Sequence, residues 1–374
     1  MLEKLPTFAD CFADLPDPRK VQQCDHKLLD ILFIAVCAVI CGADNFTDME
    51  EFGIAKQDWL RQFLELKNGI PSHDTFNRLL ARLRPSELQR RLLTWVQSVA
   101  ALSDGDIVPI DGKTLRRSHQ RRNGKEALEL VSAWARKNRL MLGQVKVADD
   151  SNEITAVPSL LQLLELKGCI VTVDAMHCQK TTVAEIRRQQ AHYVVALKQN
   201  QGQMYDGVKS FFEDVRQERT HFFEIQECQT VDGEHGRIEE RHYWQVNVPE
   251  DLAGREGWAD LHSLGMCEAK REVNGKTSIE QRYYLSSLGV NVKCLSEAIR
   301  GHWSIENSLH WVLDVVFRED ESRVRVGEAA ENLAIIRRLA LGLLQQEKTL
   351  KRGVKTKRLK AALDETYLLK ILNT

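Results

Sequence analysis

Three acidic residues stand where a protein that binds divalent cations would need its carboxylates. Asp111 follows the apolar run 107–110, Asp174 follows the apolar run 169–173, and Glu306 lies inside a helical pattern at 299–320. Both runs are typical of buried parallel strands, so we expect the two aspartates at the same edge of a sheet. A pair of Mg²⁺ ions held by carboxylates can activate a hydroxyl and stabilise the leaving oxygen at phosphorus. The three acids therefore indicate metal-assisted phosphodiester chemistry on DNA.

Each acid also has an ordinary structural explanation. An aspartate directly after a strand is often a turn former or a helix N-cap, and Gly112 would let the chain turn after Asp111. A glutamate in a charged helix is usually solvated. Three other acids in the same segment are alternatives to Glu306 as the third ligand: Asp314, Glu319 and Asp320. We favour Glu306, because the alternatives lie two turns further along the helix or near its end.

Two histidines flank Glu306 in the same pattern. His302, Glu306 and His310 recur every four residues, which places them on one face of a helix. Such a series could bind zinc, because imidazole and carboxylate are both zinc ligands. The two aspartates offer the oxygen ligands that Mg²⁺ prefers, so we expect the histidines to contact phosphate or to orient Glu306.

Basic residues gather near the acids and in the C-terminal segment. Lys113, Arg116 and Arg117 follow Asp111, and Arg121, Arg122 and Lys125 extend this basic cluster. The segment 348–360 is rich in Lys and Arg and is consistent with a solvated face or with DNA contact. The turn 235–237 could contact phosphate. Trp244 and Trp258 could stack on an unpaired base, although core packing is the commoner role. The residues expected to contact DNA are Lys113, Arg116, Arg117, Lys198, Arg237, Arg300, His302 and His310.

The composition is that of a globular protein in a reducing compartment. The 374 residues are 43% hydrophobic with a net charge of −1, so DNA contact would depend on local clusters of cations. Nine cysteines, an odd number without a Cys-x-x-Cys pair, argue against disulfides and zinc ribbons. The apolar stretch 31–41 is too short for a bilayer, which needs ~20 residues, and no secretory signal is evident. We therefore expect a cytoplasmic protein without membrane association and a buried helix at 31–41.

The elements that position the acids follow from the apolar periodicity. Residues 1–104 show helical patterns without a convincing strand, with a helix expected at 45–64 and a helix at 73–83 capped by Ser72. This succession of helices is found both in helix-turn-helix motifs and in generic helical bundles. From residue 107 strands appear: a hairpin at 128–135 and 140–147, helices at 158–167 and 181–190, and strands at 169–173 and 193–197. Acids on the first and fourth strands of this series are typical of an RNase H-like order.

Several motifs occur in a fixed order along the chain: GIPSHDTFNRLL, IDGKTLRRS, VTVDAMHCQK, YVVALKQNQG and HWSIENSLHWVLDVVFRED. Together they resemble the DDE transposases of the ISAs insertion-sequence group, which includes the H-repeat-associated proteins. The resemblance runs nearly end to end. It implies an RNase H-like core in which Asp111, Asp174 and Glu306 bind a pair of Mg²⁺ (or Mn²⁺) ions. It also implies double-stranded DNA as substrate and a homo-oligomer on that DNA.

The sequence departs from related transposases in two places. Cut-and-paste relatives carry Tyr, Arg and Lys around the catalytic Glu, where this chain has Ile299, His302 and Leu313. Within the group a Gly commonly follows the lysine at Lys198, where this chain has Gln199. The resemblance therefore supports the metal role of the Glu306 helix more than its DNA contacts.

We therefore expect an α/β protein with an RNase H-like catalytic core at 105–199 and 291–345, interrupted by a β-rich insertion at 200–290. A helical N-terminal domain at 1–104 is a candidate for DNA-end binding, and a basic helical tail follows at 346–374. The expected function is transposition of an insertion sequence, with metal-dependent strand cleavage followed by strand transfer. The alternatives are an RNase H-like nuclease without strand transfer, and a catalytically inactive remnant or DNA-binding protein.

Overall fold

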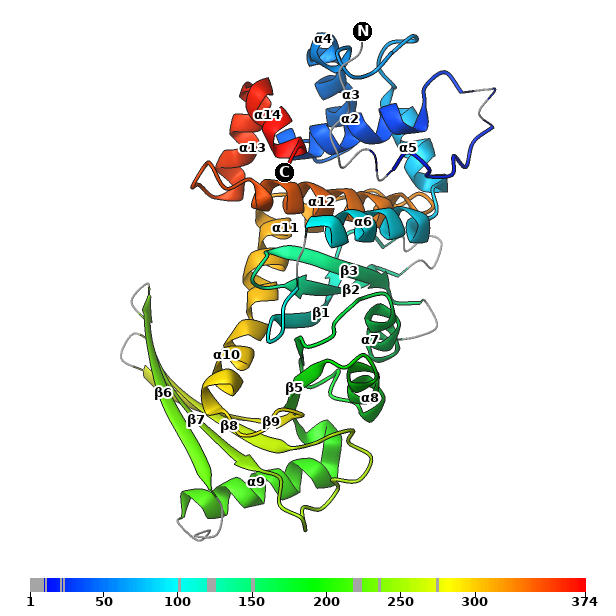
Figure 1. The fold of residues 1–374 in the computed structure, drawn as a ribbon. Coiled ribbons are helices and arrows are strands. Elements are labelled where there is room, and N and C mark those ends of the chain that lie inside the picture. Colours follow the sequence, from blue (N-terminus) through cyan, green and yellow to red (C-terminus); the bar gives the residue numbers. More distant parts are fainter. Residues whose placement is uncertain are drawn as a thin grey trace.

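A computed structural model describes most of the chain. It covers residues 10, 12–20, 22, 24–99, 102–119, 126–148, 152–217, 224–234, 237–273 and 276–374. Figure 1 shows a helical unit at one end, a mixed sheet flanked by helices in the middle, and a curved antiparallel extension at the other end.

One nine-stranded sheet runs through the molecule in the order β3-β2-β1-β4-β5-β9-β8-β7-β6. The strands are β1 (Ile107–Leu115), β2 (Leu128–Ala135), β3 (Leu140–Lys146), β4 (Ile170–Val173), β5 (His192–Leu197), β6 (Ile225–Glu234), β7 (Arg237–Asn247), β8 (Ser263–Val273) and β9 (Lys276–Ser286). Strands β1, β4 and β5 are parallel to one another, and the remaining pairs are antiparallel. The predicted hairpin of β2 and β3 and the predicted strands β4 and β5 are confirmed.

The segment 200–290 does not form a sheet of its own. Its last strand, β9, pairs antiparallel with β5, with Val194 opposite Ser286 and Leu197 opposite Tyr283. Strands β6 to β9 thereby extend the central sheet, and α9 (Gly202–Arg216) packs against β9. The β-rich character expected for this segment is present, but it is continuous with the strands that carry Asp111 and Asp174.

Helices cover both faces of the central strands. On one side α7 (Glu153–Gln162) contacts β2 and β3, and α8 (Lys180–Arg188) contacts β5. On the other side α10 (Val292–His302) crosses β1, β4 and β5, and α11 (Trp311–Val315) continues in the same direction (Figure 1). The helix expected at 158–167 was placed too late, because Asn152 accepts the Thr155 backbone N–H and caps α7 upstream.

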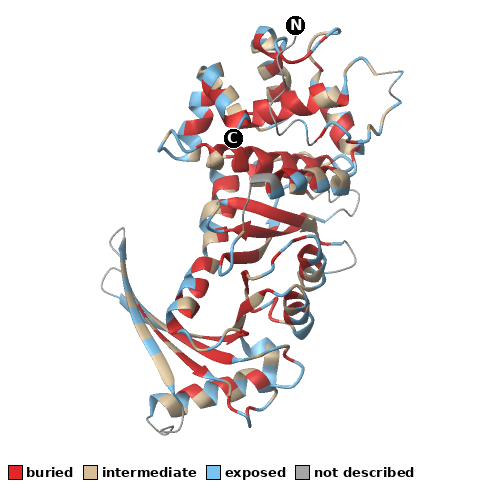
Figure 2. Ribbon diagram, viewed as in Figure 1, coloured by how far each residue is buried: buried red, intermediate tan, exposed pale blue. Residues whose placement is uncertain are grey.

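The helical unit joins both ends of the chain. It contains α2 (Leu28–Cys41), α3 (Phe46–Ala55), α4 (Gln57–Leu60), α5 (His73–Arg82), α6 (Pro85–Val99), α12 (Ala329–Gln346), α13 (Val354–Leu363) and α14 (Glu365–Leu372). Helix α12 lies between α2 and α6 and also touches β3, and Figure 2 shows α2 and α12 as almost wholly buried. The buried helix expected at 31–41 is confirmed, and the helix expected at 45–64 is divided at Lys56.

The basic C-terminal segment is only partly a solvated face. Lys357 and Arg358 are buried where α13 packs on α2 and α12. Lys357 Nζ donates to the Leu344 carbonyl at 2.8 Å, and Arg358 donates to the Val39 carbonyl at 3.0 Å. Lys357 therefore ties α13 to α12 and Arg358 ties it to α2, and the expectation that the whole cluster faces solvent or DNA is wrong for these two cations.

Among the residues that the structure covers, no single helix is both long and apolar enough to cross a membrane, although α2 and α3 together, bent by 95°, have the necessary length and composition.

Candidate active site

Asp111 and Asp174 lie side by side on neighbouring parallel strands. Ile110 of β1 stands opposite Val173 of β4, so the next residue of each strand is an aspartate. Asp174 ends its strand as expected, and its Oδ1 accepts the His177 backbone N–H at 3.1 Å. Asp174 therefore forms the turn after its strand and also lies beside Asp111.

The chain does not turn after Asp111. Strand β1 continues to Leu115, with Gly112 opposite Val131. Gly112 instead leaves room for the Glu153 carboxylate to approach β1, because a Cβ there would lie 2.3 Å from Oε1 of Glu153. The buried His177 holds this carboxylate, with Nε2 3.2 Å from Glu153 Oε2. The predicted turn is wrong because a glycine chosen for close approach has the same sequence signal as one chosen for a turn.

Gly112→Ala tests this packing. The new methyl group would displace the Glu153 carboxylate from the fully buried His177, and leaving buried polar groups unpaired costs about 1–3 kcal/mol. We expect a loss of that size in urea unfolding. Gly233→Ala in β6 is the matched control, because a Cβ there meets nothing within 4 Å. Equal stabilities of the two variants would contradict the close approach of Glu153 to β1.

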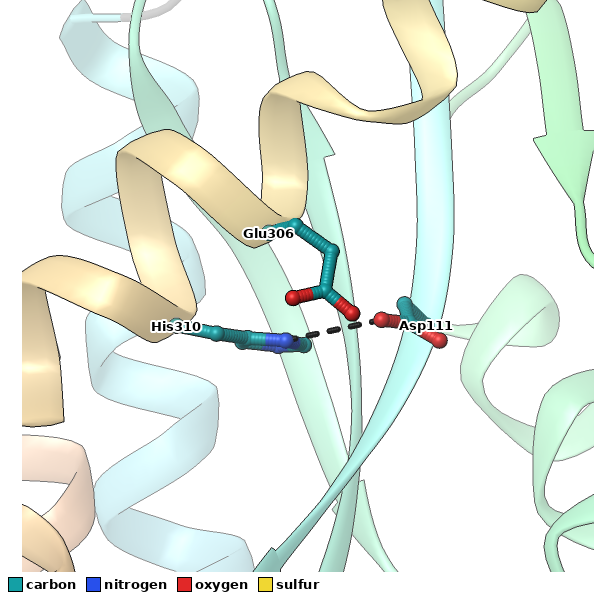
Figure 3. Close-up of side chains that lie close together, drawn as sticks. All are labelled: Asp111, Glu306 and His310. Carbon is teal, nitrogen blue, oxygen red and sulfur yellow. Dashed lines mark ion pairs between the residues drawn. The ribbon is translucent and has the colours of Figure 1, made fainter. Parts of the chain in front are cut away.

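The helix that carries Glu306 is not a regular α-helix. Helix α10 ends at His302, a π-helical turn spans Glu306–His310, and α11 follows. Such π turns within α-helices are frequent at functional sites. The π turn points Glu306 and His310 together toward Asp111, as Figure 3 shows.

The tightest group of possible ligands differs from the expected one. Ligand atoms of Asp111, Glu306 and His310 all lie within 4.8 Å of one another, and His310 Nδ1 is 3.4 Å from Asp111 Oδ2. Asp174 lines the same cleft of about 250 Å³ together with Asp111 and Glu306. His302 lies on the cleft wall with Nδ1 3.1 Å from the Thr172 hydroxyl. His310 therefore belongs to this compact group of possible ligands, and His302 does not. The sequence alone had left open a zinc site that would use both histidines.

Burial and like charge shape the electrostatics of this cleft. Burial, together with the charges of Glu306 and Asp174, raises the pKa of Asp111 to about 7. Burial lowers the pKa of His302 to about 4 and that of His310 to about 3, so both imidazoles are neutral near pH 7. Crowded carboxylates beside a neutral imidazole fit a divalent cation, which would relieve their repulsion.

The raised pKa of Asp111 predicts a pH dependence of stability without metal. The folded protein holds this proton up to about pH 7, whereas the unfolded chain releases it near the ordinary aspartate pKa of 3.8. Stability should therefore fall as the pH rises from about 4 to about 7. Asp111→Asn removes the titration, so its stability relative to the unmodified protein should rise between about pH 4 and about pH 7. Urea unfolding with a chelator measures both proteins, and a constant difference would contradict the raised pKa.

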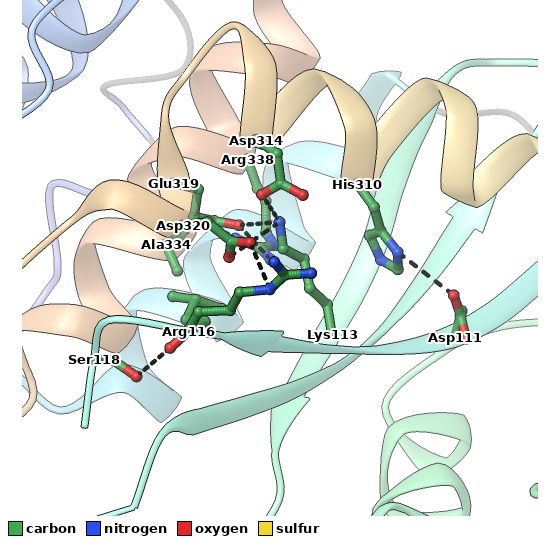
Figure 4. A network of polar contacts seen from close by, with 11 residues as sticks. Asp111, Lys113, Arg116, Ser118, His310, Asp314, Glu319, Asp320, Ala334 and Arg338 are labelled. Atoms are coloured by element: carbon green, nitrogen blue, oxygen red, sulfur yellow. Dashed lines mark hydrogen bonds and ion pairs between the residues drawn. The ribbon is translucent and has the colours of Figure 1, made fainter.

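Lys113 does not reach the surface where DNA could bind. Its side chain is only 7% exposed, and Nζ pairs with Asp314 and lies 3.5 Å from Glu319 and 3.9 Å from Asp320 (Figure 4). This arrangement argues against the expected phosphate contact of Lys113. Asp314, Glu319 and Asp320, the three alternatives to Glu306 as a metal ligand, therefore surround Lys113 and do not line the cleft.

The other residues expected to contact DNA are scattered. Lys198 lines the cleft beside Asp174. Arg116 is 83% exposed with Nε 3.3 Å from Asp320, and Arg117 is exposed beside it. Arg300 pairs with Asp232 of β6 at 2.9 Å. Arg237 begins β7, but its side chain, His235, Gly236, Arg121, Arg122 and Lys125 lie outside the described residues.

Some residues at the cleft had no signal in the sequence. Glu280 and Arg282 reach it from β9, and the Arg282 guanidinium lies 5.2 Å from the centre of the Trp303 ring. Trp303 is 42% exposed in the cleft wall. Trp258 is buried, and the half-buried Trp244 packs against His242 with ring centres 3.7 Å apart and ring planes tilted by 33°, in line with the packing role favoured for both. Only the β5–β9 pairing could have brought Arg282 to this site.

Comparison with known proteins assigns the family. Residues 102–343 match the family described as "Transposase DDE domain", and residues 9–96 match the one described as "DDE_Tnp_1-associated". A putative transposase YncI of Escherichia coli O157:H7 is 39% identical over 98% of this chain and 95% of its own. The H repeat-associated putative transposase YhhI of E. coli K12 is 37% identical over 96% of this chain and 95% of its own.

Two weaker similarities complete the comparison. An inactive transposase YbfQ of E. coli K12 is 45% identical over 18% of this chain and 80% of its own. The piggyBac transposase synaptic complex with hairpin DNA aligns with a TM-score of 0.40 and 11% identity, over 99% of this chain and 78% of that chain. The transposase family match covers more than half of the residues, and YncI and YhhI match nearly end to end, so the chain belongs to the DDE transposase family.

Proposed function

We propose that the chain cleaves the ends of an insertion sequence in a metal-dependent reaction and joins the exposed 3′-hydroxyl to target DNA. One observation carries the proposal: Asp111, Asp174 and Glu306, from three distant segments, line a single cleft. Carboxylates gathered in one cleft suit phosphodiester chemistry that needs no covalent enzyme intermediate. We assign the catalytic and metal-binding roles to these three residues.

We propose that the strands β3-β2-β1-β4-β5 form an RNase H-like core. Their order, the antiparallel β2 and the parallel β4 and β5 support this assignment, as do the acids on the first and fourth strands. The domain boundaries predicted from the sequence remain a proposal. The continuity of β9 with β5 and the position of α12 within the helical unit argue for close coupling between the predicted domains.

We assign a separate role to each of the main side chains of the cleft. Asp111 and Glu306 would hold one of two Mg²⁺ or Mn²⁺ ions, and Asp174 would bind the other. When bound, such ions activate the attacking hydroxyl and stabilise the leaving oxygen. Lys198, at the cleft margin, would hold a non-bridging phosphate oxygen through a charge-assisted hydrogen bond. The neutral His302 would orient the cleft wall through Thr172 and would not contribute positive charge to phosphate.

The proposed substrate is double-stranded DNA. Arg116 and Arg117 are exposed at the end of β1, where they could hold the duplex backbone beyond the cleft. Arg300 and Arg237 remain candidates on α10 and β7. We further propose a homo-oligomer that pairs two element ends, and action in the bacterial cytoplasm, where the eight free cysteines of the described residues would stay reduced.

A strand-transfer reaction tests the proposal. The purified chain would be incubated with labelled DNA carrying the flanking ends of its gene, a target plasmid, and Mg²⁺ or Mn²⁺. Metal-dependent cleavage and joined product, both absent with Asp174→Asn, are the expected result. Cleavage without joining would favour a nuclease, and DNA binding without any broken strand under either metal would favour an inactive remnant.

A further inference from the structure

We propose that His310 binds a metal ion directly. The cation proposed above to be held by Asp111 and Glu306 would then have two carboxylates and one imidazole as ligands. The proposal rests on the metal-dependent function argued above and names the ligand set of that site. Its basis is the compact group of Asp111, Glu306 and His310, whose ligand atoms lie within 4.8 Å of one another (Figure 3).

The imidazole of His310 is built into this position. The residue is 6% exposed, and Nδ1 points to Asp111 Oδ2 at 3.4 Å. Nε2 is buried and has no hydrogen-bond partner among the described residues. A ligand role for Nδ1 places the ring proton on Nε2 and leaves the Nδ1 lone pair facing the two carboxylates. The competing arrangement places the proton on Nδ1, which would then donate to Asp111 and make His310 only an orienting neighbour.

The next contact along the same two elements fixes this geometry. Four residues beyond His310, Asp314 pairs with Lys113, which lies two residues beyond Asp111 on β1 (Figure 4). Four residues of helix advance about 6 Å and two residues of strand about 6.6 Å, so successive side chains of the two elements meet in register. The Lys113–Asp314 ion pair, in which Lys113 is buried and Asp314 is half-buried, therefore helps to hold the His310 turn over Asp111.

A mixed ligand set changes the expected metal preference. Imidazole nitrogen suits first-row transition metals, whereas Mg²⁺ prefers oxygen ligands alone. Mn²⁺ accepts both donors, so the site should bind Mn²⁺ more tightly than Mg²⁺. Removing the imidazole should weaken Mn²⁺ binding by about tenfold or more and reduce the preference over Mg²⁺.

Pulsed electron paramagnetic resonance of Mn²⁺ bound to the full chain, without DNA, tests the proposal. A coordinated imidazole gives a ¹⁴N coupling, which should convert to a ¹⁵N coupling when the protein is made with ¹⁵N-histidine. We expect the coupling in the unmodified protein and in His302→Asn, and its loss in His310→Gln. The isotope result needs no variant, so it stands even where His310→Gln fails to fold.

Several outcomes would overturn the assignment. Bound Mn²⁺ without a histidine nitrogen coupling, a coupling that survives His310→Gln, and a coupling lost only in His302→Asn each exclude it, as does a chain that binds no Mn²⁺. The proposed function is judged separately by strand transfer. A histidine coupling in a chain that never cleaves DNA would sustain the ligand and reject the function, whereas cleavage without the coupling would do the reverse.

Discussion

Asp111→Asn is expected to abolish DNA cleavage while the protein stays folded. The amide removes a charged ligand from the centre of the site, where Asp111 adjoins both Glu306 and His310. Metal-ion catalysis contributes several kcal/mol, and each 1.36 kcal/mol is a factor of ten, so a loss of about 10³-fold or more is expected. The raised pKa of Asp111 means that this variant should be at least as stable as the unmodified protein near neutral pH. The loss would therefore report chemistry and not unfolding.

The companion measurements locate the effect in the cleft. Asp174→Asn and Glu306→Gln should lose cleavage to a similar degree and keep binding of end DNA. Asp251→Asn, an exposed residue outside the cleft, is the control and should cleave at the unmodified rate. An active Asp111→Asn protein with unchanged metal dependence would show that the reacting site lies elsewhere.

The adjacency of the two aspartates could be predicted because it depends on local pattern. Apolar runs of four or five residues ending in Asp are typical of buried parallel strands, and parallel strands place their carboxyl ends together. The register of Ile110 opposite Val173 agrees with that expectation. The signal for each strand and its terminal Asp is short in range, whereas the pairing of β1 with β4 is seen only in the structure.

The roles of Lys113 and His310 could not be predicted for the opposite reason. Lys113 belongs to a basic run that resembles a DNA-binding patch, but its ion pair is with Asp314, 201 residues away. His302 and His310 each lie four residues from Glu306, so the sequence could not tell which of them lies among the acids. The π turn at Glu306–His310 separates them, and no residue type in that segment signals such a turn.

Long-range pairing also decided which segments form one unit. The β-rich character of 200–290 was visible as alternating residues, but the pairing of β9 with β5 was not. Likewise α12 was assigned to the catalytic core by its position, whereas its buried faces pack on α2 and α6 as well as β3. A helix buried on all sides carries little periodicity to show its neighbours.

Arg338→Met is expected to be the most destabilising of the substitutions considered. Arg338 Nη1 lies 2.7 Å from Glu319 Oε1, and both side chains are fully buried. Burial would raise the pKa of Glu319, but the charges of Arg338 and Lys113 outweigh it and lower the pKa to about 2. Removing one partner of a buried ion pair costs about 3–5 kcal/mol, and in this variant Glu319 would keep the more distant Lys113 at 3.5 Å, so a loss toward the lower end is expected. Urea unfolding at pH 7 measures this loss.

The control and the pH dependence separate a buried charge from a lost contact. Arg318→Met breaks an exposed pair with Glu321, where both side chains are more than half exposed and solvent screens the charges, so the stability should be nearly unchanged. Because the pKa of Glu319 is lowered from 4.5 to about 2, its pairing stabilises the fold fully above pH 4.5 and is lost as the pH falls toward 2. The deficit of Arg338→Met should accordingly narrow as the pH falls below 4.5. A deficit that stays constant with pH, or one no larger than that of Arg318→Met, would mean that Glu319 does not depend on Arg338 for its charge. The support beneath Lys113, and through Asp314 beneath the Glu306 helix, would then have to come from packing alone.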